Sequence, residues 1–166
     1  MALAPSPAEK ARLTGLARAA WMERRLSLSR GVLDRPMPDR PGRPDRPELL
    51  PPRQMARRSL GSAAGRVAFL HAIAHIELNA VDLAWDIVGR FAREAMPRSF
   101  YDQWVRVAGE EAIHFGLLGE RLAAFGAAYG DFPAHDGLWQ AAEATGGDLT
   151  ARLAIVPLVL EARGLD

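Results

Sequence analysis

The distribution of proline constrains this fold more than any other feature of the sequence. Seven of the twelve prolines lie in residues 34–58, whereas residues 59–96 contain none. Proline fixes one backbone angle and lacks an amide donor, so it excludes regular helices and central strands. We therefore expect residues 34–58 to form an extended Pro/Arg-rich arm, polyproline-like in places. The apolar side chains of "PELLPP" favour an arm that wraps on the body of the protein over a free linker.

Residues 1–33 are predicted to contain an N-terminal helix. Ser6 can cap its first turn, Pro7 occupies the first helical position, and Glu9 is placed to complete a capping box. Apolar residues then follow at helical spacing until the pattern fades near Gly31.

Residues 59–166 are predicted to form a helical bundle. Apolar residues recur every three or four positions from Ser62 onward, and a second such stretch opens at Pro97 and ends at Gly126. Two further helices are expected: a short one around Trp139, and a third bundle helix from Asp148 to Gly164 with a kink at Pro157. Because no stretch shows sustained strand alternation, we expect an all-α protein.

The composition excludes several classes of protein. The 166 residues include no cysteine, which excludes disulfides, thiolate zinc sites and cysteine nucleophiles. No Gly-rich phosphate loop and no Gly-x-Ser-x-Gly elbow is present. The start lacks a basic stretch followed by an apolar core, and the longest unbroken apolar run is far shorter than the ~18 residues of a membrane span. We therefore expect a cytoplasmic protein with no membrane partner.

The net charge of +1 conceals an asymmetry between the two parts of the chain. Residues 1–60 carry thirteen basic and six acidic side chains, whereas residues 61–166 carry eight and fourteen. The basic part could bind nucleic acid, or it could lie across the acidic body of its own protein. Because no aromatic residue lies between Leu26 and Ser59, the arm offers no platform for stacking bases, and we disfavour the nucleic-acid interpretation.

Three of the predicted bundle helices each direct a glutamate toward an apolar face. Glu77 shares its face with apolar residues only, Glu111 and His114 lie one turn apart in "GEEAIHF", and Glu161 follows the apolar "PLVL". Buried carboxylates are costly unless they are paired. The partners could be one another, an arginine such as Arg66 or Arg106, or a metal ion. A glutamate from one helix followed by Glu-x-x-His from the next is the half-site of di-iron or di-manganese bundles.

The stretches "HAIAHIELNAVDLAWD", "EEAIHFGLL", "YGDFPAHDGLW" and "LVLEARGLD", together with the "RPDRPELLPPR" arm, resemble a bacterial ferritin-like family of unknown function. This resemblance covers most of the chain from about residue 40. It implies a ferritin-like bundle with a dinuclear iron or manganese site, and O₂- or peroxide-dependent oxidase or hydroxylase chemistry. By that resemblance the candidate metal ligands are Glu77, Glu111, His114 and Glu161. The alternative is a non-catalytic helical scaffold, or a truncated family member that assembles with a partner.

One feature departs from the pattern of such bundles. A complete site needs a second Glu-x-x-His on a fourth helix, but only five residues follow Glu161 and the motif occurs once. Either the site is incomplete, or a second copy of the chain completes it as a homodimer.

His71 and His75 also lie one turn apart, on another face of the first bundle helix, and Asp82 and Asp86 continue roughly the same side. These residues could form a second ligand face. We favour a structural role, in which they anchor the arm or the short Trp139 helix by hydrogen bonds.

Overall fold

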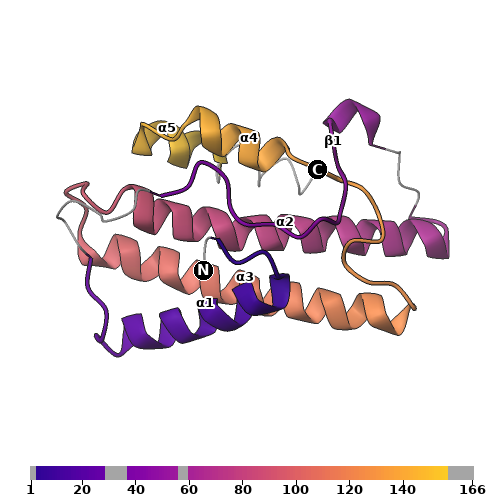
Figure 1. The fold of residues 1–166 in the computed structure, drawn as a ribbon, viewed down its shortest axis with the longest axis horizontal. Coiled ribbons are helices and arrows are strands. Elements are labelled where there is room, and N and C mark those ends of the chain that lie inside the picture. The colour runs from indigo at the N-terminus through magenta and orange to yellow at the C-terminus, as the bar shows by residue number, and fades with distance from the viewer. Residues whose placement is uncertain (1–2, 29–36, 56–59, 157–166) are drawn as a thin grey trace.

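The computed structural model describes residues 3–28, 37–55 and 60–156, and these residues are mostly helical, which confirms the all-α prediction (Figure 1). The long helices are α1 (Pro7–Met22), α2 (Ala63–Arg90) and α3 (Arg98–Ala124). The short elements are β1 (Leu49–Leu50), the 3-10 helix η1 (Pro52–Gln54), β2 (Ala134–His135), α4 (Gly137–Ala144) and α5 (Leu149–Leu153).

The helix starts agree with the capping signals in the sequence. The Ser6 hydroxyl accepts a hydrogen bond from the Glu9 amide, and Ser62 and Asp148 cap α2 and α5 in the same way. The helix ends agree less well, because α1 stops at Met22 rather than near Gly31. Arg24 adopts a left-handed backbone with φ 63° just past the end of this helix. That conformation terminates an α-helix whatever the apolar pattern beyond it.

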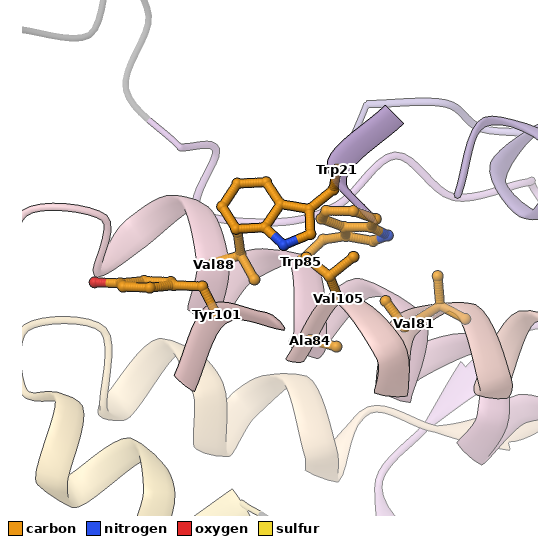
Figure 2. Packing of buried hydrophobic residues seen from close by; sticks show 8 residues of the cluster. Trp21, Val81, Ala84, Trp85, Val88, Tyr101 and Val105 are labelled. Carbon is orange, nitrogen blue, oxygen red and sulfur yellow. The ribbon is translucent and has the colours of Figure 1, made fainter. Parts of the chain in front are cut away.

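Helices α2 and α3 run side by side and form the centre of the molecule (Figure 1). Helix α1 packs along them, while α4 and α5 lie on the other side of α2. The main core cluster combines residues of the three long helices: Trp21, Val81, Ala84, Trp85, Val88, Tyr101, Val105 and Ala108 (Figure 2). A second cluster joins α2 to the chain beyond β2: Leu83, Leu138, Trp139, Ala142 and Val156.

The described part of the arm, residues 37–55, lies on the body of the protein. Its Leu49 pairs with Ala134 in a short parallel bridge, and the Trp139 indole N–H donates to the Asp39 carbonyl at 2.9 Å. Arg40 forms an ion pair with Asp136. Arg40 and Arg43 of the arm thus contact the body of the protein, the latter through Asn79. The bridge was not predicted because a two-residue strand is too short to show alternation.

Helix α2 has the length and composition of a membrane span, with a mean hydropathy of 1.3 over its most apolar window. However, 56% of that window is buried within the protein. This burial is expected for the core helix of a soluble protein, and it explains why α2 is apolar over most of its circumference.

Candidate metal centre

The structure brings together three of the four predicted ligands. Glu77 projects from α2 toward α3, and Glu111 and His114 project from successive turns of α3. One ligand atom of each residue lies within 4.8 Å of the other two. His114 Nδ1 lies 2.8 Å from a Glu111 carboxylate oxygen and 3.7 Å from a Glu77 oxygen. Glu161 lies outside the described residues.

The cluster is less buried than the sequence suggests. The side chains of Glu77 and Glu111 are 19% and 22% exposed, but that of His114 is 53% exposed. Its neighbours Ile113 and Leu117 are exposed as well. We expected this part of α3 to be covered, and that expectation is wrong for the described part of the chain. There, α2 covers Glu111 in part, but no element covers Ile113, Leu117 and the exposed half of His114.

The two carboxylates lie close enough together to compete for a proton. Burial raises the pKa of Glu77 to about 8, and the hydrogen bond with Glu111 and the charge of that residue add to the effect. The hydrogen bond to Glu111 in turn raises the pKa of His114 above its ordinary value. Near neutral pH the cluster therefore holds a proton. A metal cation could bind at the same place if it displaced that proton.

Within the described residues, no arginine provides the positive charge that would pair with Glu77 or Glu111. Arg66, one of the expected partners, donates instead to the Leu60 carbonyl at 3.3 Å. The other, Arg106, is exposed on α3, and neither forms an ion pair with Glu77 or Glu111 in the described ranges. The interpretation as an arginine-paired polar network is thus not supported by the contacts that the structure describes.

His71 and His75 bind the loop between α3 and α4. The Gly130 amide donates to His71 Nε2 at 2.9 Å. His75 Nε2 lies 3.1 Å from the His135 carbonyl, so it must donate, and Nδ1 then accepts from the Tyr129 hydroxyl at 2.9 Å. Burial lowers the pKa of His75 to about 4, so the ring is neutral with both nitrogens engaged. These contacts agree with a structural role, but the histidines hold the loop before α4 rather than the arm or the Trp139 helix that we expected.

The same face of α2 carries two buried ion pairs that sequence reasoning missed. Lys10 of α1 contacts Asp82 at 2.6 Å, with side chains 2% and 4% exposed, and Arg152 of α5 contacts Asp86. Burial raises the pKa of Asp82 to about 6 even though Lys10 opposes this shift. No local signal identifies the pairs, because their partners lie 72 and 66 residues apart in the sequence.

Comparison with known proteins identifies the family. The model of a family described as "Protein of unknown function (DUF455)" matches residues 3–166, and the chain belongs to this family. A protein of Haemophilus influenzae (strain ATCC 51907 / DSM 11121 / KW20 / Rd), described as "Uncharacterized protein", is 48% identical over 128 residues. The match covers 74% of this chain and 44% of that relative, so the chain spans less than half of the relative's length. No solved structure matches.

Proposed function

We propose that Glu77, Glu111 and His114 bind an iron or manganese ion, and that the chain forms part of a ferritin-like bundle that performs O₂- or peroxide-dependent oxidation. The observation that carries this proposal is the convergence of two carboxylates and one imidazole within 4.8 Å at the α2–α3 interface. The expected cytoplasmic location, without a membrane or nucleic-acid partner, belongs to the same proposal.

The donor set fits these metals. Two carboxylates and an imidazole suit iron and manganese, whereas structural zinc sites are usually closed by thiolates, and this chain has no cysteine. Bound iron or manganese would supply the redox chemistry with O₂ or peroxide. The three side chains would hold the ion, and Glu77 is placed to exchange a proton as the charge at the site changes.

A second copy of the chain would complete a dinuclear centre. Two copies about a two-fold axis provide four carboxylates and two imidazoles, the ligand set of di-iron bundles. The exposed Ile113 and Leu117, 55% and 58% accessible, flank His114 on the side that such a copy would cover. We expect metal-loaded wild-type protein to be dimeric by light scattering, and Leu117→Lys to be monomeric. If loaded wild-type protein is a monomer, the second copy is not part of the site.

We expect the affinity for Mn²⁺ to rise with pH from 6 to about 8. Metal binding must displace the protons of Glu77, whose pKa is about 8, and of His114, whose pKa is raised above its ordinary value. At low pH these protons compete with the ion, and above about pH 8 the competition ends. Calorimetric titration of Mn²⁺, and of Fe²⁺ without oxygen, measures both the affinity and the protons released.

The matched control for this titration is Glu110→Gln. It removes one carboxylate from the adjacent, exposed position of α3 and leaves the cluster intact. Its titration should match that of wild type at every pH. A wild-type protein that takes up neither ion at any pH would overturn the proposed function.

A further inference from the structure

A cavity of about 450 Å³ lies between the arm, the end of α2 and the segment that joins α4 to α5. This volume is in the range of small-molecule sites. Eight residues line it: Asp39, Arg90, Trp139, Ala142, Glu143, Gly146, Gly147 and Arg152. None of them belongs to the candidate metal centre.

One wall of the cavity carries two arginines, and a single carboxylate of the protein pairs with both. Asp86 lies behind this wall and contacts both Arg90 and Arg152, so one carboxylate serves two guanidinium groups. Arg152 is fully used, because its remaining donors bond to Thr145 Oγ1 and the Ala142 carbonyl. Of these two arginines, Arg90 is therefore the one whose positive charge can attract a ligand.

Arg90 has one edge directed to the cavity. Its Nε and Nη2 atoms contact Asp86, and Nη2 also donates to the Pro38 carbonyl at 2.8 Å. Nη1 takes part in none of these contacts. It lies 3.9 Å from the point where a Cβ at Gly146 would be, and a Cβ at Gly147 would meet nothing within 4 Å. Gly146 thus leaves space beside an available donor, and Gly147 borders open space in the same lining.

Negative charge is found elsewhere on the cavity lining. Glu143, in the last turn of α4, pairs with Arg40 at 3.1 Å, and Asp39 of the arm is exposed. Both carboxylates line the same cavity as Arg90, whereas Arg152 is already paired within the protein. A ligand that complements this lining carries both charges and is neutral overall.

We propose that this cavity binds a small zwitterion, whose oxyanion contacts Arg90 Nη1 beside Gly146 and Gly147 and whose ammonium group faces Asp39 and Glu143. The oxyanion gains a charge-assisted hydrogen bond from a guanidinium that Asp86 only half neutralises. Trp139 also lines the cavity, so its signal can report on a bound ligand.

The test is an NMR titration that follows the indole N–H of Trp139, which donates to the Asp39 carbonyl at 2.9 Å. The probes are glycine, β-alanine, 4-aminobutyrate and 5-aminopentanoate, which vary the separation of the charges. Pentanoate and pentylamine each lack one charge, and inorganic phosphate is an anion only. We expect at least one amino acid to bind saturably, and about tenfold more tightly than either singly charged analogue, since each lacks one charge-assisted contact.

Gly146→Ala provides the decisive variant. Its methyl group meets no atom closer than 3.4 Å, so the fold is retained, but it occupies the space beside Arg90 Nη1. Binding should weaken about tenfold, the loss of one charge-assisted contact. Gly116→Ala in α3, where a Cβ meets nothing within 4 Å, is the matched control and should bind as wild type does. The proposal is overturned if no amino acid shifts the Trp139 signal, if phosphate or pentanoate binds equally well, or if Gly146→Ala binds unchanged.

Discussion

Replacement of Glu111 by glutamine is expected to abolish metal binding and to leave the fold intact. The amide keeps the size of the side chain but removes the charge that a divalent ion requires. The loss of an outer partner of a ligand already costs 10–100-fold in affinity, so the loss of a direct ligand should exceed about 100-fold. The measurement is iron and manganese content per chain after loading and dialysis, with Glu110→Gln as the control.

The fold should tolerate Glu111→Gln because the amide keeps the size of the side chain and its oxygen can still accept a hydrogen bond from His114. The charge of Glu111 helps to raise the pKa of Glu77 to about 8, so its removal should bring the Glu77 pKa closer to the ordinary value. Thermal unfolding of the metal-free variant should therefore be unchanged or slightly improved. A Glu111→Gln protein that retains wild-type metal content would show that this carboxylate is not a ligand.

Replacement of Lys10 by methionine is expected to cause the largest loss of stability. Lys10 Nζ contacts Asp82 at 2.6 Å and donates to the Gly42 carbonyl at 2.9 Å, and the side chain is 2% exposed. Without it Asp82 is a buried carboxyl with no ion-pair partner among the described residues. Breaking a buried pair in this way costs about 3–5 kcal/mol, a large part of the ~5–15 kcal/mol of a typical domain. Denaturant unfolding measures this loss.

Two controls separate the buried pair from general effects of the substitution. Arg12→Met on the same helix removes the exposed ion pair with Glu9, and its effect should be small. The double variant Lys10→Met/Asp82→Leu removes both charges, and it should recover much of the stability that the single variant loses. Equal midpoints for Lys10→Met and Arg12→Met would show that the buried pair does not stabilise the fold.

The sequence predicts those features of the fold that depend on local signals. The Ser6 and Ser62 caps and the positive φ of Gly126 fixed the helix limits that we expected. The predicted end of α1 was wrong because the actual end depends on the left-handed conformation of Arg24. Nothing in the sequence distinguishes this arginine from the others. Glycine marks such positions in a sequence, and other residues do not.

Part of the candidate site was predictable because it also depends on local signals in the sequence. The spacing of Glu111 and His114 is a property of one helix, and Glu77 stands out as a charge on an apolar face. The exposure of His114 depends on what packs beside α3, which helical spacing cannot give. The contacts of Lys10 with Asp82 and of Arg152 with Asp86 depend on the tertiary arrangement alone.

Anomalous diffraction from a crystal grown with Mn²⁺ tests the metal-binding proposal most directly. A peak should lie between α2 and α3, with donor atoms of Glu77, Glu111 and His114 each within coordination distance of the ion. No peak at this cluster in a crystal grown at saturating Mn²⁺, or a peak bound only by other residues, would contradict the proposal. The three side chains would then form a polar network without a metal.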